Sequence, residues 1–265
     1  MNLNDSLTIA LKAAIDAGRI ILHYYNLPFK VEIKDDHSPV TIADKESQKI
    51  ILSYLKTTPY PIISEEMETI SYEDRKKWDY CWIVDPLDGT KEFIHKNGEF
   101  TVNIALVHNQ IPILGVIYSP ASGELYFAAN AMGAFKIRIE NHDLNLDTLK
   151  KLPTATETNL LKVVVSRSHS NAQTDSFVEA LKETHPNVEK VVGGSSVKIC
   201  KVAEGTAHIY PRFGRTMEWD TAAGHAILKY SNAKLIDIDT MQELLYNKEN
   251  LENPFFIAIQ NHIKL

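Results

Sequence analysis

The sequence has no excess of basic residues, few cysteines and no long apolar run. It contains 34 acidic and 28 basic residues, which gives a formal net charge of −6. Surfaces that coat nucleic acid are typically basic, so this balance argues against nucleic acid as a partner. An acidic protein that binds a polyanionic substrate needs local positive charge, which bound metal ions and a few lysines or arginines can supply.

The two cysteines, Cys81 and Cys200, fall within runs predicted to be buried, a usage typical of a reducing compartment. No apolar run approaches the roughly 20 residues of a membrane span, and the first residues do not form the apolar segment of a signal peptide. We therefore expect no transmembrane segment and a cytoplasmic protein, and leave peripheral attachment to the inner membrane open.

The stretch YCWIVDPLDGT organises the chain. Tyr80–Val84 is a short apolar, β-branched and aromatic run, which predicts a buried strand. Pro86 biases Asp85 toward extended geometry, so we expect the strand to end in a rigid loop with Asp85 and Asp88 three residues apart. Mg²⁺ is usually held by a few carboxylates together with phosphate oxygens, and the Leu87 carbonyl can join them. The alternative is that these aspartates only cap a following helix.

The segment DPLDGTKEF, residues 85–93, resembles the signature of the inositol monophosphatase superfamily, the Mg²⁺-dependent, lithium-sensitive phosphatases. Its continuation NGEFTVNIALV is similar to the CysQ-type 3'(2'),5'-bisphosphate nucleotidases in particular. The resemblance extends from Asp44 to Gly224. It implies an α/β, or α+β, fold, a layered α/β/α/β/α sandwich of the inositol monophosphatase and fructose-1,6-bisphosphatase type, with the active site between its halves.

Hydrophobic periodicity divides the chain into two predicted domains. They are an N-terminal α+β domain, residues 1–150, and a C-terminal α/β domain, residues 151–265. The resemblance implies that the first carries the main metal-binding loop and the second the last metal ligand and the nucleotide-binding residues. Residues 141–158 are polar and predicted to connect them. Predicted helices cover 7–24 (capped within 4–6), 42–55, 171–185, 196–204 and 220–230; predicted strands cover 31–34, 61–64, 80–84, 101–107, 113–118, 124–129, 134–139, 160–165, 188–192, 207–210, 234–237 and 255–259.

Three further acids stand at predicted element ends. Asp44 falls in the first turn of a helix, Glu65 follows a short strand beside Glu66, and Asp220 begins a helix in the motif WDTAAG. Each has a plain structural alternative, since acids commonly stabilise helix starts and paired glutamates are mostly solvated. The resemblance instead implies that Asp44 is catalytic, that Glu65 bridges metals and that Asp220 is a further metal ligand, and we expect Glu66 to be structural.

The resemblance also implies a centre of two or three Mg²⁺ ions. Glu65, Asp85 and the Leu87 carbonyl would hold the first ion, and Asp85, Asp88 and Asp220 the second. Bound metal neutralises phosphate charge and lowers the pKa of water.

Thr90 would orient and relay the proton of the attacking water to Asp44, with Asp44 and Glu65 as the basic members. Backbone N–H groups of Gly89 and Thr90 can hold phosphate.

Substrate selection is expected from the second half of the chain. The segment GGSSVK ends a strand and opens a helix, a place that suits an anion. In the bisphosphate nucleotidases, residues matching Ser195, Lys198 and Arg212 contact the 5'-phosphate side, and one matching His169 contacts the nucleotide. Inositol monophosphatases carry an acid near Phe213, where this chain has an aromatic flanked by arginines. The alternative is an ordinary surface loop.

These features predict a Mg²⁺-dependent enzyme that converts adenosine 3',5'-bisphosphate to AMP and phosphate. Its sulfated relative PAPS is a second expected substrate, which links the enzyme to sulfate assimilation. Two alternatives are a phosphatase of inositol phosphates or related sugar phosphates and a nucleotide-sensing regulator without turnover. Thr90 and Asp44 argue against the regulator, because binding alone needs no water-activating pair. The expected partner is the small-molecule substrate, and the chain is expected to be a monomer or a homodimer.

Overall fold

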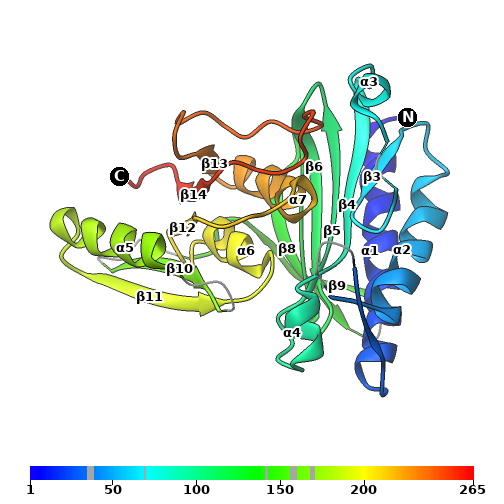
Figure 1. Cartoon of the computed structure of the whole chain (residues 1–265), viewed down its shortest axis with the longest axis horizontal. Coiled ribbons are helices and arrows are strands. Elements are labelled where there is room, and N and C mark those ends of the chain that lie inside the picture. The colour runs from blue at the N-terminus through cyan, green and yellow to red at the C-terminus, as the bar shows by residue number, and fades with distance from the viewer. Residues whose placement is uncertain (35–38, 69, 141–142, 156–159, 168–170) are drawn as a thin grey trace.

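The protein is described by a computed structural model of residues 1–34, 39–68, 70–140, 143–155, 160–167 and 171–265. Its elements form five alternating layers of helix and sheet (Figure 1). Helices α1 (Leu3–Tyr25) and α2 (Ile42–Leu55) form one outer layer, and α5 (Ala172–Thr184) forms the other. Helices α6 (Val197–Glu204) and α7 (Glu218–Lys229) lie between the two sheets. The predicted layered α/β/α/β/α sandwich is therefore confirmed.

A seven-stranded sheet is built from the first part of the chain, with its strands ordered as in the sequence. They are β3 (Ile62–Ser64), β4 (Tyr80–Asp88), β5 (Thr101–His108), β6 (Ile111–Ser119), β7 (Glu124–Ala129), β8 (Gly133–Glu140) and β9 (Asp143–Lys151). β3 and β4 are parallel, and the other neighbouring pairs are antiparallel. The polar turns between the predicted strands thus indicated the meander correctly.

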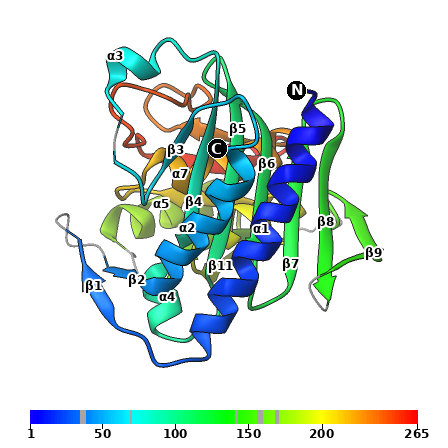
Figure 2. The same ribbon diagram turned by 90° about the vertical axis from the view of Figure 1, so that its right-hand side faces the viewer.

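Helices α1 and α2 cover one face of this sheet (Figure 2). Ala10, Ala14 and Ala17 of α1 belong to the same buried cluster as Trp82 and Val84 of β4. Alternate residues of β4 face the opposite cluster, so both faces of the strand are buried, as its continuous apolar run predicts.

The start of α1 differs from the prediction. The helix begins at Leu3, and the Asn2 side chain accepts a 2.8 Å hydrogen bond from the Asp5 N–H. A cap within residues 4–6 is therefore wrong, because Asn2 offers an equally good capping oxygen two residues before Asn4.

The other face of the seven-stranded sheet is covered by α7, which comes from the second half of the chain (Figure 1). Gly115 of β6 permits this close approach, since a Cβ added there would lie 2.2 Å from the Ala223 carbonyl oxygen and 2.9 Å from the Ala226 Cβ. Both neighbours lie on the helix, so neither can turn away as a flexible side chain would.

Gly115→Ala is expected to destabilise the protein by about 1–3 kcal/mol, because α7 must shift to admit the methyl group. The denaturant midpoint should fall, and we expect activity to fall with it since α7 also carries Asp220. Gly214→Ala is the matched control, because its added Cβ would meet nothing closer than 3.6 Å. Equal stability of the two variants would show that β6 and α7 can accommodate an added methyl group without loss of packing.

A five-stranded sheet follows in the order β11-β10-β12-β14-β13. Its strands are β10 (Leu161–Ser166), β11 (Val188–Gly193), β12 (Ile209–Arg212), β13 (Ala233–Asp237) and β14 (Phe256–Gln260). β10 is parallel to β11 and β12, whereas β14 is antiparallel to β12 and β13. Val178 and Leu181 of α5 pack against one face, and residues of α6 and α7 pack against the other.

The polar segment 141–158 was predicted as a connection, and this is wrong for residues 143–151. They form β9, an edge strand of the seven-stranded sheet with an almost wholly exposed surface. An exposed edge strand carries no alternation of apolar and polar residues, so the pattern that reveals strands is missing there. The division into two domains at residue 150 stays a prediction.

Four short elements complete the described chain. β1 (Val31–Ile33) pairs with β2 (Pro39–Thr41), and α3 (Tyr72–Arg75) and α4 (Thr90–Ile94) flank the sheet. Cys81 and Cys200 are both free and buried, as expected. Among the residues that the structure describes, no helix combines the length and the apolar character of a membrane span.

Candidate metal centre and phosphate pocket

The DPLD segment forms a bulge within β4 rather than a loop after its end. Asp85 pairs with Asn103 of β5 and Asp88 with Thr101, and the register shifts between the two pairs. Pro86 has no N–H to donate, so a regular ladder cannot continue through it. The strand thus extends beyond its predicted end. Bulges redirect side chains, and here both aspartates stay on the strand.

Three carboxylates from the two halves of the chain meet at this bulge. Asp85, Asp88 and Asp220 each have an oxygen within 4.8 Å of the others'. Burial, followed by the charges of Glu65 and the two other aspartates, raises the pKa of Asp85. Burial and the charges of Asp88 and Glu65 raise the pKa of Asp220 to about 8. A set of crowded, oxygen-only donors with unfavourable mutual charge fits a hard divalent cation.

Asp220 also has the structural role that was weighed against metal binding. It occupies the third position of α7, and its Oδ2 accepts a 2.7 Å hydrogen bond from the Met217 N–H at the helix start. Capping and membership of the cluster are therefore combined in one side chain, because a carboxylate offers two oxygens with several lone pairs.

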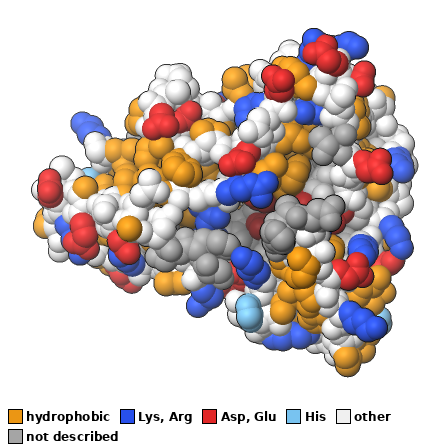
Figure 3. Space-filling view, viewed as in Figure 1, with side chains coloured by type: hydrophobic (Ala, Val, Ile, Leu, Met, Phe, Trp, Pro, Cys, Tyr) orange, Lys and Arg blue, Asp and Glu red, His pale blue; other side chains and the backbone are white. Residues whose placement is uncertain are grey.

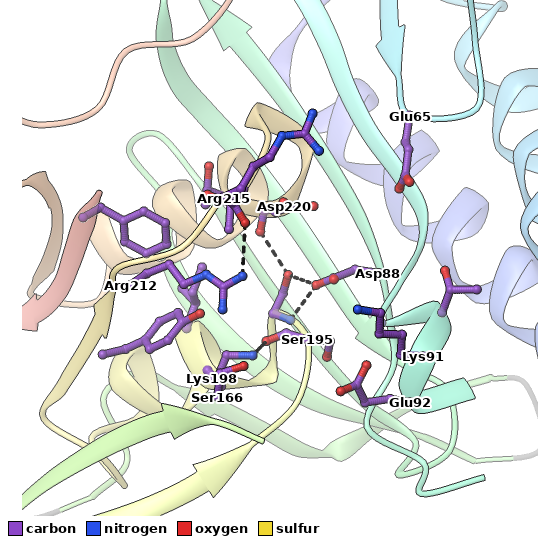
Figure 4. A pocket seen from close by; sticks show the side chains of 18 of the residues that line it. Glu65, Asp88, Lys91, Glu92, Ser166, Ser195, Lys198, Arg212, Arg215 and Asp220 are labelled. Carbon is purple, nitrogen blue, oxygen red and sulfur yellow. Dashed lines mark hydrogen bonds between the residues drawn. The ribbon is translucent and has the colours of Figure 1, made fainter. Parts of the chain in front are cut away.

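Glu65 lies in the same cavity but is not part of the three-carboxylate cluster found among the described residues. Its Oε1 lies 2.9 Å from the Lys34 Nζ, and Lys34 also forms an ion pair with Glu66. Figure 4 shows Glu65 set apart from Asp88 and Asp220. Lys34 was not singled out from the sequence, because nothing local links Lys34, which follows β1, to Glu65, which follows β3.

Thr90 and Asp44, which are 46 residues apart in the sequence, are brought together at the starts of α4 and α2. The Thr90 Oγ1 donates to Asp44 Oδ1 at 3.0 Å and lies 3.3 Å from the Leu87 carbonyl. Asp44 Oδ2 accepts from the backbone N–H and the hydroxyl of Thr41, both at 2.7 Å. Burial raises the pKa of Asp44, and the hydrogen bonds from Thr41 oppose this rise. Asp44 therefore closes the capping box of α2 and also holds the Thr90 hydroxyl.

The first turn of α6 and the end of β12 supply the positive side of the site. Lys198 is 5% exposed, and its Nζ donates to the Ser195 carbonyl at 2.7 Å and lies 5.3 Å above the Tyr210 ring. Burial lowers the pKa of Lys198 to about 8. The Arg212 Nη2 donates to the Arg215 carbonyl, whereas its buried Nε has no hydrogen-bond partner among the described residues.

Most of these residues, but not Asp44 or Asp85, line one cavity of about 230 Å³. Asp88, Asp220 and Glu65 lie toward one side of it, and Ser195, Lys198 and Arg212 toward the other (Figure 4). The space-filling view shows a hollow in the middle of this face, between the two sheets, with basic side chains around it (Figure 3). The cavity can therefore take a ligand with two separated anionic groups, one of them at the carboxylate cluster through a bridging cation.

Comparison with known proteins assigns this chain to a family. The model of the inositol monophosphatase family matches residues 2–257. The chain belongs to the inositol monophosphatase family. Members of this family are metal-dependent, in agreement with the acidic cluster of Asp85, Asp88 and Asp220.

Within the inositol monophosphatase family, similar proteins carry a common description. The chain is 41% identical over 247 residues to the 3'(2'),5'-bisphosphate nucleotidase CysQ of Escherichia coli strain K12, covering 92% of this chain and 95% of that protein. It is 44% identical to the CysQ of Buchnera aphidicola, covering 84% and 80%. A crystal structure of CysQ from Bacteroides thetaiotaomicron superposes with a TM-score of 0.89 at 44% identity, covering 98% and 99%.

Two residues of this chain that contact the site, Ser196 and Asn103, were not predicted from the sequence. Ser196 contacts Asp88 directly, and Asn103 contacts Ser196. The segment GGSSVK was interpreted only as an anion site, with Ser195 singled out by the resemblance, and no contact of Ser196 with a carboxylate was predicted. His169, expected at the nucleotide, lies outside the described residues.

Proposed function

We propose that this chain is a Mg²⁺-dependent 3'(2'),5'-bisphosphate nucleotidase, a phosphoric monoester hydrolase that converts adenosine 3',5'-bisphosphate to AMP and phosphate. Its relatives from Escherichia coli and Buchnera aphidicola carry the name 3'(2'),5'-bisphosphate nucleotidase. The observation that carries the choice of substrate is the pocket with two ends, carboxylates at one and buried Lys198 with Arg212 at the other. The sulfated nucleotide PAPS presents the same two ends and is a further proposed substrate.

We propose that the metal ions are Mg²⁺ and that Asp85, Asp88 and Asp220 hold them. The Leu87 carbonyl and Glu65 would complete the ligands of two or three ions. To bind an ion, Glu65 must then give up its ion pair with Lys34. When bound, the metal supplies charge neutralisation for the scissile phosphate and acidifies water.

Thr90 and Asp44 handle the proton in the proposed reaction. A hydroxyl that donates its hydrogen to Asp44 at 3.0 Å keeps a lone pair free to accept a proton from the attacking water. The water oxygen bonds to phosphorus as the bond from phosphorus to the 3'-oxygen breaks; the water's proton passes through Thr90 to Asp44, and the 3'-oxygen takes a proton from solvent water. Backbone N–H groups of Gly89 and Thr90 would orient the phosphate. Because water attacks phosphorus directly, no covalent enzyme intermediate is required.

Replacement of Lys198 or Arg212 by alanine tests the choice of substrate. A hydrogen bond to a charged group is worth roughly 1.5–3 kcal/mol, so each change should lower kcat/KM for adenosine 3',5'-bisphosphate by about 10- to 100-fold. The same changes should barely affect 3'-AMP, which lacks the second phosphate, because their contact energy is available only to a bisphosphate.

Lys201→Ala provides a matched control one turn further along α6. Equal losses on both substrates would contradict a 5'-phosphate site and favour an inositol phosphate or sugar phosphate phosphatase. Including inositol 1-phosphate in the panel addresses that alternative directly. Phosphate release with and without Mg²⁺ separates an enzyme from a nucleotide sensor. A monomeric or dimeric state and a cytoplasmic location stay predictions.

A further inference from the structure

Ser196 occupies the N-cap of α6, but its hydroxyl does not cap that helix. A serine at this position commonly accepts a hydrogen bond from an N–H two or three residues later. Here the side chain is 2% exposed and turned away, toward the seven-stranded sheet. The Val197 N–H at the helix start instead donates to Ser195 Oγ at 3.4 Å, so the Ser196 hydroxyl is free to bond outside its own helix.

The hydroxyl and the backbone N–H of Ser196 both meet one oxygen of Asp88. Ser196 Oγ lies 2.5 Å and Ser196 N lies 2.6 Å from Asp88 Oδ2. These two residues are 108 positions apart and belong to the two sides of the cavity. The dashed lines at Asp88 in Figure 4 mark both bonds. Two donors on one oxygen fix the plane of the carboxylate and leave the second oxygen available to a cation.

Asn103 fixes the direction in which the Ser196 hydroxyl donates. A hydroxyl has one hydrogen, and the Asn103 Nδ2 donates to Ser196 Oγ at 2.7 Å. The hydrogen of Ser196 then points to Asp88 Oδ2 at 2.5 Å, in preference to the Asp220 carbonyl at 3.1 Å. Asn103 is 1% exposed and faces Asp85 across the β4–β5 ladder. The chain of donors therefore runs from β5 through α6 to the carboxylate cluster.

We infer that Ser196, held by Asn103, is a positioning residue that sets the orientation of Asp88 for cation binding. The inference rests on the metal-ligand role proposed above for Asp88. Ser196 immediately follows Ser195 and lies two residues before Lys198, so the segment proposed to receive the remote phosphate also holds a carboxylate proposed to bind metal. Preorganised ligands bind a cation without the entropy cost of ordering them on binding.

The test measures cation affinity without any nucleotide. Mn²⁺ is the probe, because it prefers the same oxygen donors as Mg²⁺ and its free concentration can be followed by electron paramagnetic resonance. Ser196→Ala removes the hydroxyl but keeps the backbone N–H, and should weaken Mn²⁺ binding by about 10- to 100-fold, the range for a hydrogen bond to a charged group. Ser231→Ala is the control, since this buried serine loses one bond to the Leu228 carbonyl far from the cluster.

A second variant distinguishes positioning from general loss of packing. Asn103 Nδ2 also lies 3.5 Å from Asp88 Oδ2, at the limit of a hydrogen bond, whereas its bond to Ser196 Oγ is 2.7 Å long. Asn103→Ala should therefore also weaken Mn²⁺ binding, and combining it with Ser196→Ala should add little, because Asn103 acts mainly through the hydroxyl that is already gone. Full additivity of the two changes would overturn the inference. So would a Mn²⁺ affinity of Ser196→Ala within twofold of the unchanged protein.

The outcomes also separate this inference from the proposed function. If the unchanged protein binds no Mn²⁺, the proposed metal centre fails and the inference fails with it. If it binds Mn²⁺ normally and Ser196→Ala does too, only the inference is overturned. The choice of nucleotide substrate does not enter the measurement, so a different substrate would leave the result intact.

Discussion

Asp85→Asn and Asp220→Asn are each expected to lower turnover by on the order of 10³-fold or more while the protein stays folded. Each change removes the negative charge of a carboxylate from a cluster whose three members lie within 4.8 Å. Metal assistance is worth several kcal/mol of transition-state stabilisation, and each 1.36 kcal/mol is tenfold in rate. Asparagine has nearly the same shape, so the backbone bonds of both residues can persist, including that from Met217 to Asp220.

Folding and activity must be measured on the same preparations. Removing a buried charge from this cluster relieves repulsion, so the denaturant midpoint of both variants should be unchanged or higher. Asp175→Asn is the control, because Asp175 lies on α5 and forms an exposed ion pair with Lys190. Near-normal activity of either cluster variant at saturating Mg²⁺ would remove the basis for the proposed metal centre.

Thr90→Ala is expected to lower kcat by about 10²- to 10⁴-fold, the range for loss of general acid–base assistance. The variant loses the hydroxyl that donates to Asp44 but keeps the backbone N–H groups at the start of α4. Substrate affinity should therefore change little, and the loss should appear in kcat rather than in KM.

Thr90→Ser supplies the matched comparison, since it keeps a hydroxyl at the same position and should recover most of the rate. Metal affinity should be the same in both variants. A rise in KM with kcat unchanged would mean that Thr90 binds substrate and does not act on water, and the proton would need another route.

Features encoded within one short segment could be predicted from the sequence. The run from Tyr80 to Val84 specifies a strand buried on both faces, and the two aspartates that follow it do enter a carboxylate cluster. The bulge was missed because Pro86 was taken to end the strand, whereas the β5 partner holds the chain on both sides of it. The strand propensity of residues 80–88 contains no information about β5, the neighbouring strand that pairs with them.

Contacts between distant segments explain the other omissions. Lys34 meets Glu65, and Ser196 meets Asp88, through packing of elements that no local pattern relates. Serine at the start of α6 has an ordinary local explanation as a cap, which conceals its use across the cavity. For Asp220 the local explanation is correct, since its carboxylate caps α7, but the same side chain also belongs to the carboxylate cluster.

The layered arrangement has an electrostatic consequence. Helices α2, α6 and α7 all begin near the site, with Asp44, Ser196 and Asp220 at or within three residues of their N-terminal caps. Aligned peptide dipoles place about +0.5 elementary charge at each such end. A chain with a formal charge of −6 thereby directs positive potential from its backbone toward the place where a polyanion would lie. Because peptide groups do not titrate, that part of the field stays constant over the whole pH range in which the protein is folded.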